Sequence, residues 1–128
     1  MSFLKNIFGE NQENKPVSKV GWKLLTDAEQ LNKIIAASAE KPVLVFKHST
    51  RCHISKTALR KFENDFDLEE KIIPYFLDLI AYRTISDEIA VRFGVAHQSP
   101  QLIVIKDGVA VYNASHEGID ADKLTQFI

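Results

Sequence analysis

The feature that most constrains the fold is a tight β-hairpin predicted near the C-terminus. Two apolar stretches, 101–105 and 109–114, flank the sequence Lys106-Asp107-Gly108. Asp-Gly supplies the positive φ angles that a tight primed turn needs, so these two strands are expected to be antiparallel. Upstream, apolar stretches alternate with helical patterns, which favours βαβ units with parallel strands. A chain that contains both arrangements is expected to form a mixed sheet.

Hydrophobic periodicity predicts the remaining elements. Strands are expected at 20–25, 43–46, 72–79, 101–105 and 109–114. Helices are expected after a capping box at Thr26 and Glu29, from the Cys52 turn to Phe66, over 85–93 with Gly94 as a left-handed cap, and after Asp120. Consecutive apolar residues at 43–46 are typical of a central strand that is covered on both faces. The predicted fold class is therefore α/β, with a mixed central sheet and helices on both faces.

Length and charge limit the domain organisation and the partners. A chain of 128 residues has room for one domain with a proper core. We assign 20–128 to that domain and 1–19 to a tail and linker, with a short amphipathic helix as one option within the tail. The 16 basic and 17 acidic residues nearly cancel, which argues against nucleic acid as a partner. No signal peptide or long apolar run is recognised, so we expect a cytoplasmic protein without stable membrane insertion.

The one cysteine, Cys52, lies between a predicted buried strand and a predicted helix. A helix N-terminus offers free N–H groups and partial positive charge, both of which stabilise a thiolate. Arg51, Lys56 and protonated His53 add positive charge to the same turn. This environment favours a reactive, nucleophilic Cys52 over a buried and inert one. A single cysteine also means that the fold needs no internal disulfide.

Ser55 stands where a C-x-x-C dithiol would have its second cysteine. A serine hydroxyl can hydrogen-bond a thiolate, but it cannot attack a mixed disulfide. Chemistry at Cys52 is therefore expected to stop at an adduct until an outside thiol resolves it. Ser55 could equally be an ordinary residue of the first helical turn, and the two interpretations are compatible.

The four histidines, His48, His53, His97 and His116, raise the question of a metal site. His48 and Cys52 straddle the predicted strand–turn junction and do not share one helical face. No second cysteine or paired-ligand spacing supports a zinc site. We predict no metal and no tightly bound cofactor.

The chain resembles the thioredoxin superfamily, most clearly through Phe93-Gly94-Val95, Ser99-Pro100 and the strands that flank Lys106-Asp107-Gly108. More narrowly, it resembles the YtxJ family of monothiol bacilliredoxins (bacilliredoxin C). The matching pieces, within about residues 21–128, are Lys47-His48-Ser49-Thr50, Cys52, Ile54-Ser55, Gly94-Val95, Ser99-Pro100-Gln101 and Ser115-His116. The resemblance implies a thioredoxin-like fold in which the Ser99–Pro100 bond is cis and lies beside the reactive cysteine.

The resemblance also implies a reaction, the reduction of mixed disulfides between protein cysteines and bacillithiol, which would be the co-substrate. Its expected partners are bacillithiolated client proteins and a low-molecular-weight thiol. Cys52 would be the nucleophile. Arg51, His53 and Ser55 would tune the thiol, and Thr50, Ser99 and Pro100 would contact the substrate.

Three positions depart from the patterns of the family and the superfamily. His53 replaces a common proline, Arg51 replaces the thioredoxin tryptophan, and Phe46 replaces a buried aspartate. The alternatives are a monothiol glutaredoxin-like or iron–sulfur carrier protein and a non-enzymatic interaction module with the thioredoxin fold.

Overall fold

A computed structural model describes residues 19–128. Five strands form one sheet in the order β2-β4-β3-β5-β6. The strands are β2 (Lys23–Leu24), β3 (Val43–His48), β4 (Ile73–Asp78), β5 (Gln101–Lys106) and β6 (Val109–Ser115). The helices are α1 (Gln30–Ala37), α2 (His53–Asp65) and α3 (Arg83–Phe93), followed by the 3₁₀ segments η1 (His116–Gly118) and η2 (Ala121–Phe127).

The sheet is mixed, as the sequence predicts. β3 lies at its centre, parallel to β4 and antiparallel to β5. The β5–β6 hairpin turns at Asp107 and Gly108, whose φ angles of 53° and 79° are those of a primed turn. Gly94 ends α3 in the left-handed conformation, with φ of 66°. The predicted hairpin and this helix cap are both confirmed.

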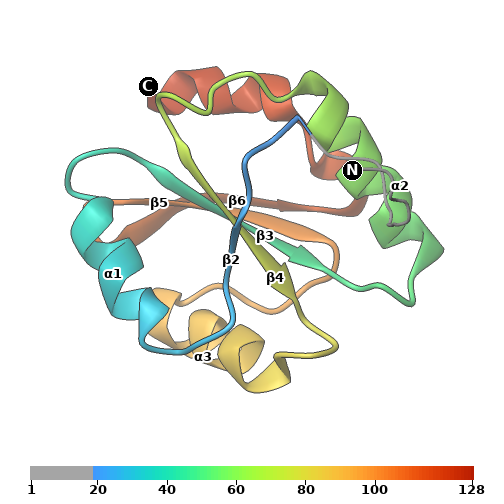
Figure 1. Ribbon diagram of the computed structural model, residues 1–128, viewed down its shortest axis with the longest axis horizontal. Coiled ribbons are helices and arrows are strands. Elements are labelled where there is room, and N and C mark those ends of the chain that lie inside the picture. The colour runs from blue at the N-terminus through green and yellow to red at the C-terminus, as the bar shows by residue number, and fades with distance from the viewer. Residues whose placement is uncertain (1–18) are drawn as a thin grey trace, which may run out of the picture.

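Two hydrophobic cores cover the two faces of the sheet. Helices α1 and α3 lie on one face, and α2 and the C-terminal segment η2 lie on the other (Figure 1). Alternate residues of β3 belong to opposite cores, with Val43 and Val45 in the first and Leu44 and Phe46 in the second. Because every residue of β3 is buried, the strand is a rigid base for the turn that follows it.

The N-terminal part of the domain departs from the prediction. The first strand is confined to Lys23–Leu24, because the Trp22 N–H donates to the Val20 carbonyl and makes a turn there. The capping box at Thr26 and Glu29 is wrong. Helix α1 begins at Gln30, whose side-chain Oε1 accepts hydrogen bonds from the N–H groups of Thr26 and Asp27.

The C-terminal helix is a 3₁₀ helix, η2, and not an α-helix. Asp120 caps it as predicted, with Oδ1 accepting from the Asp122 N–H at 3.0 Å. Leu124 and Ala121 are buried and fix the segment against the α2 face of the sheet. The predicted tail, with its optional helix, lies outside the described residues except for Lys19. Within residues 19–128, no helix has the length and apolar character needed to span a membrane.

Candidate thiol active site

Cys52 is the N-cap residue of α2, with extended backbone angles (φ −108°, ψ 120°). Its N–H donates to the Ser49 carbonyl at 3.2 Å, and its carbonyl accepts from the Lys56 N–H at 3.1 Å. The residue is half-buried, and its thiol is free. The predicted strand–turn–helix arrangement is therefore present, with β3 ending at His48 and α2 beginning at His53. This places Cys52 at the positive end of a helix of 13 residues.

The three neighbours predicted to border the thiol, Thr50, Arg51 and His53, are all exposed. None of the ion pairs found within residues 19–128 involves Arg51 or His53. Their side chains are thus available to an anionic substrate group. Thr50 lines a cavity of about 440 Å³ together with His48 and Asp78, on the side of the turn where β2 and β4 lie.

Ser55 is fully buried and faces the interior. Its Oγ lies 2.8 Å from Nδ1 of His48 and accepts a hydrogen bond from the Ser49 N–H at 3.0 Å. Since Ser49 in turn accepts from the Cys52 N–H, Ser55 ties the first turn of α2 to the loop that carries the cysteine. Its observed hydrogen bonds are therefore with His48 and Ser49, and an effect on the thiol stays a prediction.

His48 is also buried in this site. From the sequence, it was considered only as a metal ligand, and that role was rejected. Burial lowers its pKa, and the nearby carboxylates of Asp78 and Glu63 oppose that shift. The imidazole is consequently neutral at physiological pH. Its ring also packs against Phe76, with ring centroids 5.6 Å apart. The four apolar residues that precede Lys47 and His48 indicate a buried strand, so the sequence held a signal that His48 is buried but none for its contact with Ser55.

Ser99 and Pro100 lie beside the end of β3, because Lys47 pairs with Gln101 across the antiparallel strands. The Ser99–Pro100 peptide bond is cis, as the resemblance implies. The Pro100 carbonyl accepts a hydrogen bond from the His116 N–H at 3.2 Å. Within residues 19–128, the Ser99 Oγ is the buried side-chain polar atom without a hydrogen-bond partner. This segment and the Cys52 turn are therefore at the same end of the sheet.

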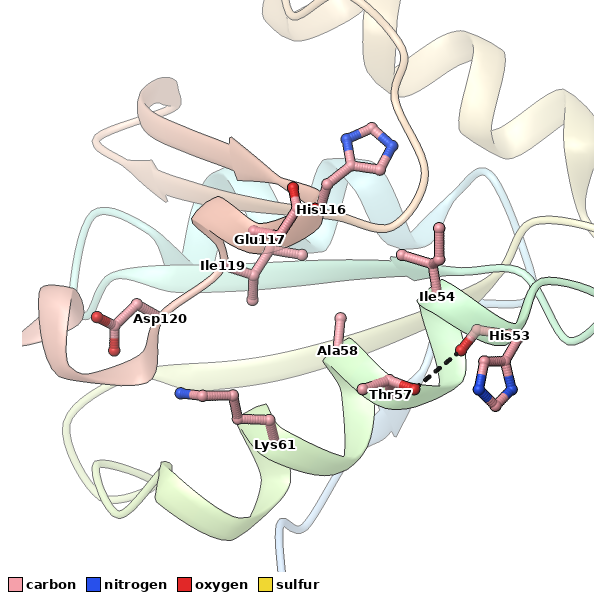
Figure 2. A pocket seen from close by; sticks show the side chains of 9 residues that line it. All are labelled: His53, Ile54, Thr57, Ala58, Lys61, His116, Glu117, Ile119 and Asp120. Carbon is pink, nitrogen blue, oxygen red and sulfur yellow. Dashed lines mark hydrogen bonds between the residues drawn. The ribbon is translucent and has the colours of Figure 1, made fainter.

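A second cavity, which we call the α2 groove, begins at the residue after the cysteine and has a volume of about 420 Å³. Figure 2 shows Ile54 and Ala58 of α2 facing Ile119 across it, with Lys61 and Asp120 at the far end. Its remaining lining residues are His53, Thr57, His116 and Glu117. Ile54 is 56% exposed, so the groove has an accessible apolar side chain two residues after Cys52. This groove could not be predicted from the sequence, because it forms only when α2 and η1 come together.

The structure also shows how the side chains that could bind a metal ion are arranged. Within residues 19–128, no group of three or more His, Cys, Asp or Glu side chains is arranged to hold a metal ion. The four histidines instead lie in different surroundings, from the buried His48 to the exposed His53.

Solved structures share this fold. A structure described as having a thioredoxin fold is 35% identical, with a TM-score of 0.68, and the match covers 80% of this chain and 89% of that chain. Thioredoxin from Malassezia sympodialis is 20% identical (TM-score 0.63, covering 88% and 92%), and thioredoxin from Fasciola hepatica is 23% identical (TM-score 0.58, covering 81% and 93%). The two thioredoxins establish the fold alone.

A thioredoxin fold with a free cysteine at the N-cap of α2, and a serine three residues later, places the chain in the class of thioredoxin-fold proteins with a single thiol at this position. The model of the family described as monothiol bacilliredoxin BrxC matches residues 23–124. The chain belongs to that family, and the resemblance inferred from the sequence is confirmed.

Proposed function

We propose that this protein removes bacillithiol from S-bacillithiolated client proteins through a mixed disulfide on Cys52. One observation carries the proposal. The only cysteine of the chain caps α2, while Ser55, at the position of a resolving cysteine, is buried and hydrogen-bonded to His48. Together with membership of the monothiol bacilliredoxin family, this supports exchange chemistry that uses one thiol of the protein.

The reaction has two exchange steps. The Cys52 thiolate attacks the bacillithiol sulfur of the client's mixed disulfide, so a Cys52–bacillithiol disulfide forms and the client leaves as a thiolate that takes a proton from water. A second bacillithiol thiolate then attacks the bacillithiol sulfur on Cys52. This step releases bacillithiol disulfide and regenerates the Cys52 thiolate. The client disulfide is reduced by two electrons, which come from the oxidation of bacillithiol, and Cys52 returns unchanged.

The surroundings of Cys52 support this chemistry. The N-terminus of α2 stabilises the thiolate as nucleophile in the first step and as leaving group in the second. Arg51 and His53 are exposed and free of ion pairs with described residues, so they can approach an anionic thiol. We assign the part of the substrate that flanks the disulfide to the surface between Thr50, Ser99 and the start of the α2 groove. An extended client segment could lie along the Ser99 backbone there.

The test is a debacillithiolation assay on one client protein prepared in two forms, bacillithiolated and glutathionylated at the same cysteine. We expect the wild-type protein plus bacillithiol to restore the client thiol in the first form much faster than in the second. Cys52→Ala should leave the rate at that of bacillithiol alone. Equal rates on the two forms would contradict the preference for bacillithiol, and full activity of Cys52→Ala would contradict the whole proposal.

A further inference from the structure

Two polar side chains lie on the neighbouring strands β3 and β5, at the end of the sheet next to the Cys52 turn and on the face that α1 and α3 cover. Lys47 of β3 and Gln101 of β5 are direct partners across the antiparallel ladder, and both are fully buried at 0% exposure. Because residues that face each other across a ladder point to the same side of a sheet, the two side chains leave the sheet together. A buried lysine and a buried glutamine in adjacent strands are costly unless their polar atoms are satisfied, which makes their partners informative.

The partners of Lys47 lie on α3 and on the loop that follows it. Its Nζ donates to the Ser86 carbonyl at 3.4 Å and lies 3.4 Å from Nδ1 of His97. The Ser86 Oγ lies 3.2 Å from Nδ1 of His97 as well. Because an ammonium group can only donate, Nδ1 is the acceptor and the His97 proton lies on Nε2. Lys47 therefore fastens the loop at His97 to the sheet.

Gln101 holds the residues on either side of His97. Its Nε2 donates to the Ala96 carbonyl at 3.0 Å, and its Oε1 accepts from the Gln98 N–H at 3.4 Å. The side chains of Lys47 and Gln101 thus contact three consecutive residues, 96–98, which lead directly into Ser99 and Pro100. We call this arrangement the loop clamp.

We propose that Lys47 and Gln101 are positioning residues, which hold loop 96–98 so that the Ser99 backbone is preorganised to receive the client next to Cys52. This inference rests on the proposed function, since it assigns the substrate surface to Ser99. An apolar side chain would fill the same interior volume without taking a cation out of water, so fold stability alone does not explain Lys47. The loop contacts do explain it, because a displaced positioning element weakens catalysis even when it is remote from the reacting atoms.

The experiment compares Lys47→Met and Gln101→Met with the wild-type protein. Methionine is flexible and close in size to both residues, but it provides none of the hydrogen bonds of the loop clamp. We expect faster amide hydrogen exchange at residues 96–99 in both variants. We also expect the KM for a bacillithiolated client to rise about tenfold, with kcat changed much less. The rate at which iodoacetamide alkylates Cys52 should stay within about twofold of the wild-type rate, because the α2 N-terminus is untouched.

Lys106→Met is the matched control, since Lys106 is the exposed last residue of β5. It should change neither the exchange nor the KM. Thermal unfolding shows which variants are folded, and Gln101→Met tests the clamp without removing a charge. Unchanged exchange at 96–99 in folded Lys47→Met and Gln101→Met would overturn the clamp, whether or not the protein is active. Faster exchange with an unchanged KM would overturn its role in positioning the client. An inactive wild-type protein would contradict the proposed function. The exchange measurement would still show whether Lys47 and Gln101 hold loop 96–98 in place.

Discussion

The Oγ of Ser55 lies 2.8 Å from Nδ1 of His48, and both residues are buried. Ser55 occupies the position at which a dithiol protein would have its resolving cysteine. Its hydroxyl is buried and hydrogen-bonded inside the protein. Through its bond from the Ser49 N–H, the same hydroxyl holds the loop that ends at Cys52. Ser55 is accordingly a structural part of the site.

Ser55→Ala is expected to destabilise the protein. The substitution leaves the Ser49 N–H and the His48 Nδ1 buried without their partner, at a cost of about 1–3 kcal/mol for an unsatisfied buried group. The free energy of unfolding, measured with urea, checks this. Thr57→Ala is the control, because the Thr57 hydroxyl is exposed and bonds only to the His53 carbonyl of its own helix. If both variants lost the same small amount, the proposed role of Ser55 in holding the loop would be wrong.

Ser55→Cys is expected to change the chemistry from one thiol to two. Cys52 and residue 55 occupy the N-cap and the first turn of α2, the arrangement of a C-x-x-C dithiol. After reaction with a bacillithiolated client, the variant should lose two hydrogens as an internal disulfide forms, and the bacillithiol adduct should not accumulate. Intact-mass analysis distinguishes the two products. A persistent adduct on the variant would show that residue 55 is held too far inside the fold to act.

The buried lysine predicts a rise in stability at alkaline pH. Burial lowers the pKa of Lys47 to about 8, an effect that Asp87 opposes and Arg83 reinforces, with neutral His97 as its hydrogen-bond partner. Below that pH, the Lys47 amine is protonated in both the folded and the unfolded state, and the buried ammonium group destabilises the folded state. Between about 8 and 10.5 the folded state alone loses its proton, so Lys47 allows stability to rise by up to about 3 kcal/mol.

The comparison with Lys47→Met isolates this effect. We expect Lys47→Met to be at least as stable as the wild-type protein at pH 7, and its advantage to shrink as the pH rises towards 10. Urea unfolding at several pH values measures the difference, with Lys106→Met as the control that shows no such trend. A difference that does not vary with pH would mean that the Lys47 ammonium is not strained by burial.

His48 predicts a loss of stability in acid. Burial lowers its pKa from the ordinary value of 6.5, so the unfolded state takes up a proton first as the pH falls. Stability from the neutral imidazole is therefore present above about pH 6.5 and is lost below it, until the folded state is protonated as well. His48→Gln should lose less stability than the wild-type protein between pH 7 and 5. Identical curves for the wild-type protein and His48→Gln would refute the claim.

Much of the fold could be predicted from the sequence, because its signals are local. Asp107-Gly108 predicted a primed turn, Gly94 predicted the end of α3, and the unbroken apolar run at 43–46 predicted a central strand. The structure has all three. The capping box failed because its two N–H donors bond elsewhere: the Thr26 N–H donates to the Gln30 side chain and the Glu29 N–H donates to the Asp27 side chain. Local patterns do not reveal which of two nearby side chains takes a backbone donor.

Only part of the site could be predicted from the sequence. The position of Cys52 at a helix N-terminus follows from the strand and helix patterns around it, and the structure places it there. The roles of His48, Lys47 and Gln101 could not be found in that way. They depend on contacts between residues far apart in the chain, such as Lys47 with His97, which only the pairing of β3 with β5 and the packing of α3 create.

The most direct test of the central claim is the intact mass of this protein after reaction with a bacillithiolated client. The wild-type protein should gain the mass of one bacillithiol while the client loses it, and Cys52→Ala should gain nothing. Addition of free bacillithiol should then remove the adduct from the wild-type protein. A wild-type protein that gains no bacillithiol, or a Cys52→Ala variant that gains it equally, would contradict the account.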